Sequence, residues 1–298
     1  MNARYSLPLA GLIVAAVLPQ AAGRAPEVRV GSQPLNVIAA GTTLWTENYG
    51  DGTVSAIDAV TRRVRTIRVG GTPGGIAYGS GSVWVSDLSG GTLIRLDPGG
   101  EILAHIELGQ GRGAGVTVYR GVVYVADYGG GGVWRVDAAS NRVLGPTKVG
   151  GHAEAVAGGF GRVWVTNSNG TLSTLDPATG AVRGRPIRIG SDADDVAMGR
   201  RAVWAVALYG QRLVRIEPAS RKVVSRTPTR GQASGVLATR HGIWVSNYDL
   251  DTVSRFDLAG KRIVRTYRVG SAPRSLAAAA GAIWVANQHS GSVSRLAP

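Results

Sequence analysis

The chain has 298 residues, a formal net charge of +14, 44 glycines, four histidines and no cysteine. The lack of cysteine excludes disulfide bonds and a lipidated cysteine at a signal cleavage site. A high glycine content without a collagen period, together with many Val, Ile and Thr residues, predicts a β-rich globular protein with many turns.

Residues 1–23 have the pattern of a secretory signal. Arg4 supplies the positive start, the apolar run extends from Leu7 to Leu18, and small residues surround a cleavage point near residues 21–23. The apolar run is too short to cross a bilayer as a helix. We therefore predict a secreted or periplasmic protein, and no later segment is expected to span a membrane.

A repeat of about forty residues follows the signal. The spacing between successive aromatic residues is 39 and then 40 five times, and each lies in a short apolar run such as SVWVSD or AIWVAN. These ring residues are Trp45, Trp84, Tyr124, Trp164, Trp204, Trp244 and Trp284. A fixed period of this length indicates a repeat architecture.

Each repeat contains four strand-like runs separated by Gly, Asp-Pro or Ser-Gly turns. Four strands per forty residues, repeated seven times, predict an all-β seven-bladed β-propeller over residues 24–298. The last repeat stops after its third strand, and the surplus strand PEVRV follows the signal. We therefore expect the N-terminal strand to complete the last blade and close the ring.

Two of the aromatic strands carry a family resemblance. VWVTN at residues 163–167 and VYVAD at residues 123–127 resemble the signature of YVTN-type propeller repeats, and PGGIA at residues 73–77 fits the same group. The broader group includes NHL-type propellers and the streptogramin (virginiamycin B) lyases. The resemblance implies a propeller fold over nearly all of the chain after the signal, and it leaves the function open because propellers host many activities.

The predicted topology places one set of loops around the central channel. With strands a to d numbered from the axis outward, the b–c and d–a loops share one face, here called the upper face, and the a–b and c–d loops share the lower face. The d–a loops lie innermost, where propellers usually bind ligands. Their candidate ligand-binding residues are Arg112, His152, Glu154, Asp192, Asp194, Asp195 and Arg274.

Glu154 and Asp194 occupy equivalent positions in neighbouring blades, and Arg274 is expected across the mouth. Paired carboxylates could hold Ca²⁺ or Mg²⁺, because both ions prefer oxygen ligands. One carboxylate could instead serve as a general base if crowding raised its pKa. The alternative is that they are solvated loop residues neutralised by Arg112 and Arg274. An Asn or Asp recurs three residues after most ring residues, where a structural role in its own turn is expected.

The lyase resemblance adds a further comparison. It implies that a Glu-Pro-His loop and a glutamate shortly after a blade tryptophan supply the metal site and the base. Here blade four reads His152-Ala153-Glu154, with the two residue types exchanged, and blade seven reads Ala272-Pro273-Arg274. No blade presents the full set, which weighs against lyase activity.

The predicted faces differ in charge. The upper face carries most of the loop carboxylates, including those of the mouth. The lower-face loops contain twelve of the cations: Arg62, Arg63, Arg120, Arg142, Arg162, Arg200, Arg201, Arg221, Lys222, Arg240, Lys261 and Arg262. Such a face could attract an anionic cell-envelope polymer or lipid headgroups, or simply maintain solubility. Nucleic acid is a weaker candidate because no aromatics alternate with these arginines.

These features favour a monomeric, non-enzymatic module that binds a ligand or a protein through its channel mouth. The first alternative is a metal-assisted lyase or hydrolase that uses the same mouth. The second is a structural cell-surface protein that acts through its basic lower face.

Overall fold

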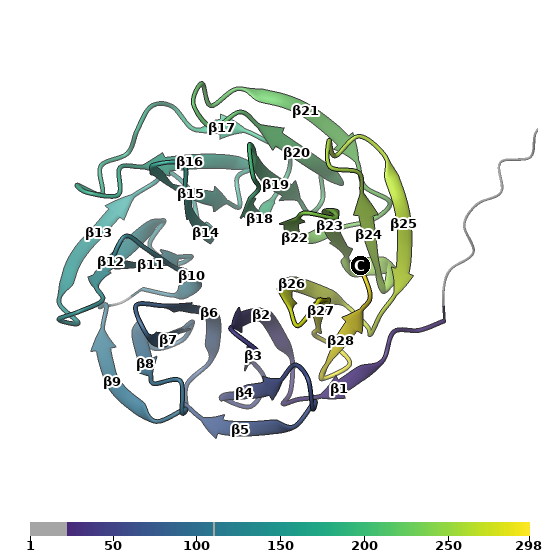
Figure 1. Cartoon of the computed structure of the whole chain (residues 1–298). Coiled ribbons are helices and arrows are strands. Elements are labelled where there is room, and N and C mark those ends of the chain that lie inside the picture. The colour runs from purple at the N-terminus through teal and green to yellow at the C-terminus, as the bar shows by residue number, and fades with distance from the viewer. Residues whose placement is uncertain (1–22, 110) are drawn as a thin grey trace, which may run out of the picture.

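The computed structural model describes residues 23–109 and 111–298. They form seven four-stranded antiparallel sheets arranged as blades around a central axis (Figure 1). This arrangement confirms the predicted seven-bladed β-propeller. All but the last residue of the predicted signal lie outside the described residues. Within the described part, no helix is long and apolar enough to cross a membrane.

The strands follow one another outward in each blade. Blades one to three contain β2 (Pro34–Ala40), β3 (Thr43–Asn48), β4 (Thr53–Asp58), β5 (Val64–Arg68), β6 (Pro73–Gly79), β7 (Ser82–Asp87), β8 (Thr92–Leu96), β9 (Ile102–Glu107), β10 (Gly113–Tyr119), β11 (Val122–Asp127), β12 (Gly132–Asp137) and β13 (Val143–Lys148). Blades four and five contain β14 (Ala153–Gly159), β15 (Arg162–Asn167), β16 (Thr171–Leu175), β17 (Ile187–Arg188), β18 (Ala193–Met198), β19 (Val203–Ala207), β20 (Arg212–Ile216) and β21 (Val223–Pro228). Blade six contains β22 (Ala233–Thr239), β23 (Gly242–Asn247), β24 (Thr252–Phe256) and β25 (Ile263–Arg268), with a 3-10 turn at Tyr248–Leu250.

The two chain ends share blade seven. It contains β26 (Pro273–Ala279), β27 (Ala282–Asn287) and β28 (Ser292–Leu296), and β1 (Glu27–Arg29) pairs with β28 as its outermost strand. Val28 lies opposite Val293 in this antiparallel pair. The expected ring closure by the N-terminal strand is therefore confirmed, and it covers an edge that would otherwise be open.

The hydrophobic core lies between neighbouring blades. Trp45 of blade one packs with Val83 and Val85 of blade two, and all three side chains are buried. The other ring residues repeat this contact around the disc, so every blade contributes one large aromatic side chain to its interface with the next blade. Because each aromatic buries a large area, the interfaces hold the ring together without disulfides.

In four blades an arginine of the third strand lies over the tryptophan of the second. Trp84 is directly opposite Arg95, whose guanidinium carbon is 4.9 Å from the ring centre. The same pair recurs in blades five, six and seven at 5.8, 5.7 and 5.9 Å. Cation–π contacts of this kind stabilise by about 0.5–2 kcal/mol each, which gives the arginine of motifs such as TLIRL a role in the fold.

Candidate functional site

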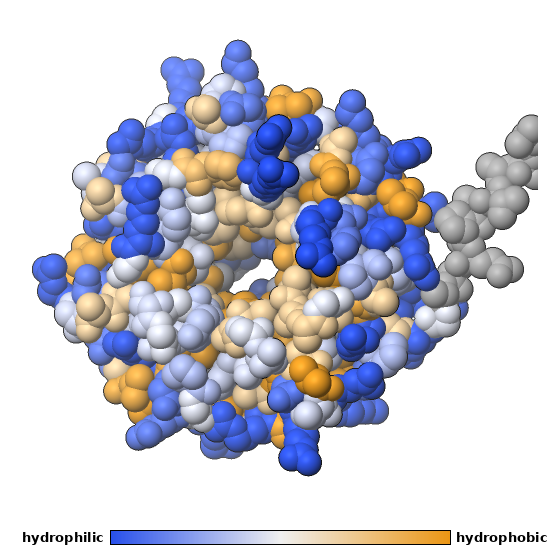
Figure 2. All heavy atoms as spheres, viewed as in Figure 1, coloured by the Kyte–Doolittle hydropathy of each residue, from blue (hydrophilic) through white to orange (hydrophobic). Residues whose placement is uncertain are grey.

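The d–a loops meet at a cavity of about 360 Å³ in the upper mouth of the channel. An opening is visible at the centre of the ring in the space-filling view (Figure 2). The cavity wall contains residues from all seven blades: Leu35, Asn36, Gly74, Leu88, Ala114, Gly115, Tyr128, Glu154, Ala155, Asp192, Asp194, Asp195, Leu208, Ser234, Arg274 and Ser275.

A β-bulge at the start of each innermost strand aims these side chains. In β18 the register shifts between Ala193 and Asp195, and equivalent shifts occur at the start of the other six inner strands. A bulge inserts an extra residue and bends its strand. Two consecutive residues, Asp194 and Asp195, therefore both reach the cavity from one strand.

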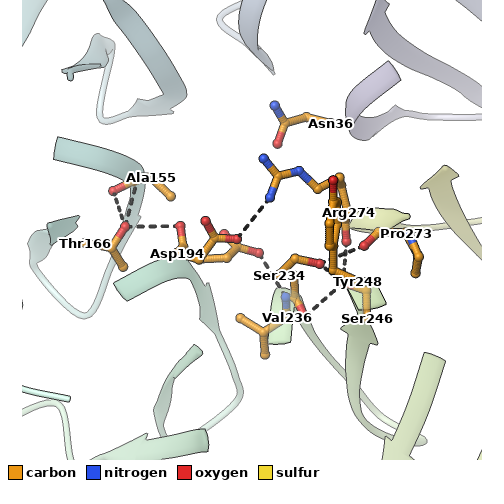
Figure 3. Close-up of polar contacts among 12 residues, drawn as sticks. Asn36, Ala155, Thr166, Asp194, Ser234, Val236, Ser246, Tyr248, Pro273 and Arg274 are labelled. Carbon is orange, nitrogen blue, oxygen red and sulfur yellow. Dashed lines mark hydrogen bonds and ion pairs between the residues drawn. The ribbon is translucent and has the colours of Figure 1, made fainter. Parts of the chain in front are cut away.

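Asp194 and Arg274 face each other across the mouth. Oδ2 of Asp194 is 3.7 Å from Nη1 of Arg274, and 17% and 30% of the two side chains are exposed. The guanidinium also lies over the ring of Tyr248 at 5.3 Å, and Figure 3 shows it extending between Asp194 and Asn36. Burial raises the pKa of Asp194 to about 6, and the nearby Arg274 limits this rise.

Asp195 connects blades five and six through hydrogen bonds to both of its carboxylate oxygens. Its carboxylate accepts backbone N–H bonds from Val196 at 2.8 Å and from Val236 of blade six at 2.9 Å. Burial raises its pKa to about 7, although both hydrogen bonds favour the ionised form. Asp195 therefore fixes the geometry of the cavity between blades five and six.

Glu154 and Asp192 are the carboxylates available to a ligand. No hydrogen bond from the described residues reaches either carboxylate. Burial raises the pKa of Glu154 to about 7, and the charges of Asp194 and Asp192 add to this rise. Burial also raises the pKa of Asp192. A positively charged ligand beside Glu154 or Asp192 would therefore favour the ionised form of that carboxylate.

The structure places Arg112 and His152 outside the cavity wall. Both side chains are exposed, and Nδ1 of His152 donates to the carbonyl oxygen of Tyr128 while the two rings lie 5.2 Å apart. Asp192 occupies the same repeat position as these two but has a left-handed backbone with φ of 56°, a conformation that Arg112 and His152 do not adopt. This backbone difference accompanies the different placement of the three side chains.

The recurrent Asn and Asp residues that follow the blade aromatics lie in structural positions. Oδ1 of Asp87 accepts the N–H of Thr72 in the preceding d–a loop and that of Ser89 in its own turn, each at 2.9 Å. Asn247 is buried, and its amide donates to the hydroxyl of Ser254 at 3.0 Å. These side chains tie the b–c turns to the loops that carry the mouth residues.

A buried glutamate beside the mouth was not among the site residues predicted from sequence. Glu47 is fully buried, and its Oε1 accepts the backbone N–H of Asn36 at 3.0 Å as well as the Asn36 amide. Oε2 has no hydrogen-bond partner among the described residues. Burial raises the pKa of Glu47 to about 8. The signal was present in TLWTEN, where other blades have Ser, Thr, Ala or Val at this position.

The described residues contain no group of three or more His, Asp or Glu side chains arranged to hold a metal ion. A divalent ion at Glu154 and Asp194 would need further ligands from backbone carbonyls or water, which Ca²⁺ and Mg²⁺ both accept. The Ca²⁺ or Mg²⁺ site therefore stays a prediction.

No family model and no curated protein matches the chain. Among solved structures, a streptogramin B lyase matches with a TM-score of 0.81 and 15% identity, covering 91% of this chain and 96% of that one. A catalytically inactive virginiamycin B lyase from Staphylococcus aureus with quinupristin also scores 0.81, at 15% identity over 92% and 99% of the two chains. The chain has the fold of these propellers. Hydrazine synthase from Kuenenia stuttgartiensis shares it as well, with a TM-score of 0.79 and 16% identity over 95% and 99%, so the likeness concerns the fold alone.

Proposed function

We propose that the protein is an exported, non-enzymatic binding module that holds a small, positively charged ligand in its channel mouth. The observation that carries the proposal is the pair of unbonded carboxylates, Glu154 and Asp192, in the wall of a 360 Å³ cavity. That volume is within the range of small-molecule sites. Arg274 offsets only part of the negative charge, because Asp194 and Asp195 line the same cavity.

The rest of the wall supports an organic cation. Leu35, Leu88 and Leu208 supply apolar surface, and the ring of Tyr128 adds an aromatic face. Apolar walls with a few convergent polar groups are typical of ligand sites, and aromatic faces attract cations. An amine with a compact hydrocarbon group would contact the carboxylates with its charge and the apolar side chains with its hydrocarbon part.

A thermal-melt screen tests the proposal. Its probes are butylammonium, phenethylammonium and choline, with Ca²⁺ and Mg²⁺ in parallel. A ligand that binds only the folded state raises the melting temperature by mass action. We expect an organic cation to raise it for the wild type and not for Glu154→Gln/Asp192→Asn. Glu101→Gln removes an exposed lower-face carboxylate and is the matched control. No shift with any organic cation would contradict the proposal.

A second candidate, a metal-assisted lyase or hydrolase, rests on the raised pKa values of Glu154 and Asp194, which line one cavity. Carboxyls with such values are suited to general-base chemistry near neutral pH. A melting shift with Ca²⁺ or Mg²⁺ that disappears in Glu154→Ala/Asp194→Ala would favour this candidate over a simple binding module.

Export is the part of the proposal that rests on residues 1–23. The expected outcome of expression in a secreting bacterial host is a mature protein that begins near residues 21–23. Intact-mass measurement of the exported fraction checks the cleavage point. A protein that keeps residues 1–23 and stays inside the cell would contradict export and leave the mouth proposal intact.

A further inference from the structure

The a–b loops form the inner ring of the lower face, on the opposite side of the disc from the proposed ligand site. None of the seven loops contains a carboxylate. The loops of blades seven, one and two contain only small or neutral residues, whereas those of blades three, five and six carry arginines. In blade four, Arg162 begins the strand directly after the loop. We name this side the basic crescent and define it as Arg120, Phe160, Arg162, Arg200, Arg201 and Arg240.

The c–d loops of blades four to six extend the positive charge outward with Arg183, Arg185, Lys222, Lys261 and Arg262, all exposed. The carboxylates of these c–d loops form hydrogen bonds within the loops themselves. Asp176, Glu217 and Asp257 each accept a backbone N–H within the loop that contains them. Figure 2 shows strongly hydrophilic side chains beside small hydrophobic patches on the face toward the viewer.

Phe160 is the unusual member of the crescent. It occupies the first central position of a two-residue turn, with φ of 53°, followed by Gly161 with φ of 71°. Turns of this type favour Asn, Asp or Gly at that position, because other side chains are strained there. Ser80, Arg120 and Ala280 adopt the same left-handed conformation at this place in blades two, three and seven, so Phe160 differs from them only by its large apolar side chain. Phe160 is 42% exposed, so part of this large apolar residue faces solvent.

We propose that the basic crescent docks the protein on an anionic lipid bilayer, with Phe160 inserted at the headgroup boundary. Arginines near an anionic surface gain attraction from its potential. An exposed aromatic side chain beside them gains further by leaving water for the acyl boundary. An anionic polymer would use the cations but would offer no apolar layer for Phe160, so the exposed apolar side chain favours the bilayer.

Vesicle co-sedimentation tests this proposal directly. The purified protein is mixed with vesicles of phosphatidylcholine containing about one third phosphatidylglycerol, and with phosphatidylcholine alone. We expect binding to the anionic vesicles only, weakened by added salt. Phe160→Asn should reduce binding at least about threefold and keep or raise the melting temperature, because Asn suits the turn. Loss of binding therefore cannot be attributed to unfolding.

A matched pair of charge variants separates the crescent from net charge. Arg200→Gln/Arg201→Gln/Arg240→Gln should weaken binding about a hundredfold, at about fivefold for each arginine. Arg29→Gln/Arg68→Gln/Arg268→Gln removes the same charge from exposed positions on outer strands and should change binding far less. Equal losses in the two triple variants, or full binding by Phe160→Asn, would overturn the proposal. Binding to polyphosphate without binding to vesicles would overturn it in favour of a polymer.

Discussion

At the scale of single residues, the mouth owes its chemistry to carboxyls whose neutral form is favoured by burial. The pKa of Glu154 is about 7 and that of Asp194 about 6, so both groups titrate near physiological pH. A cationic ligand interacts with the ionised forms, and lowering the pH removes them. The mouth should therefore bind cations more tightly at pH 8 than at pH 6.

The first prediction is that the affinity for an organic cation falls by about fivefold to tenfold between pH 8 and pH 6. Below its pKa the carboxyl of Glu154 is mostly protonated, and its ionisation then costs free energy that reduces the affinity. Titration calorimetry at the two pH values measures it. In Glu154→Gln the pH dependence should become shallower. An affinity that rises toward pH 6 would show that the ligand prefers the protonated mouth.

A second prediction concerns Glu47. Its folded-state pKa is raised from 4.5 to about 8, so its contribution to stability is fully present below pH 4.5 and is lost as pH rises toward 8. Glu47→Gln keeps an oxygen for the Asn36 bonds and removes the titration. Urea unfolding should show the variant matching the wild type at about pH 4 and exceeding it by about 1 kcal/mol or more at pH 8. The same difference at both pH values would contradict the raised pKa.

At the scale of elements, the blades are joined by a small number of polar contacts added to the apolar interfaces. Tyr124 is the one ring residue that is not tryptophan, and its hydroxyl donates to the carbonyl oxygen of Pro177 in blade four at 2.9 Å. Serine or threonine hydroxyls on the second strands of blades two, four and six bond to carbonyls of the next inner strand. These contacts fix neighbouring blades relative to one another.

The third prediction is that Tyr124→Phe lowers the free energy of unfolding by about 1–2 kcal/mol, because the Pro177 carbonyl loses a buried donor. Tyr78→Phe alters an exposed tyrosine and should change stability by less than about 0.5 kcal/mol. Chemical denaturation of both variants provides the comparison. Equal stabilities would mean that the interblade hydrogen bond contributes nothing.

The elements were predictable because each repeat carries its own markers. The forty-residue spacing of Trp84, Tyr124 and Trp164 and the missing last strand were enough to predict seven blades and their closure. The arginine partners of the tryptophans were not predicted, because their pairing depends on strand register. The third strands of blades one and four carry Ala56 and Thr174 opposite their tryptophans, so the pair is not a constant of the repeat.

The mouth was predictable only in part. Topology alone brings Glu154, Asp194 and Arg274 to one cavity, as the repeat alignment indicated. His152 was placed with them on sequence grounds, yet it faces outward. Which of the equivalent loop residues reaches the cavity was not visible in the residue types, because Asp192 lines the wall whereas Arg112 and His152 do not. The burial of Glu47 was not predicted, because burial between blades cannot be seen in a single strand.

At the scale of the whole molecule, the ring depends on a short strand. β1 contributes only three residues to blade seven, yet it joins the two ends of the chain. Ring closure buries Val28 against a core that contains Trp284 and Leu44. The two faces of the disc then serve different purposes in our account, with a carboxylate-lined mouth above and the basic crescent below.

The fourth prediction is that removal of residues 24–30 destabilises the entire ring, because blade seven loses an outer strand and exposes an open edge. The melting temperature should fall by more than about 5 °C, and aggregation on heating should increase. Thermal melts with light scattering measure both quantities. A truncated protein that melts like the full chain would show that β1 is dispensable for closure.

The central claim is that the mouth binds an organic cation through Glu154 and Asp192. Titration calorimetry with the most effective cation of the melt screen, at pH 8, tests it most directly by comparing the wild type with Glu154→Gln/Asp192→Asn. The account predicts one-to-one binding to the wild type and a loss of at least about tenfold in affinity for the variant. Equal affinity for both proteins would place the ligand elsewhere and contradict the claim.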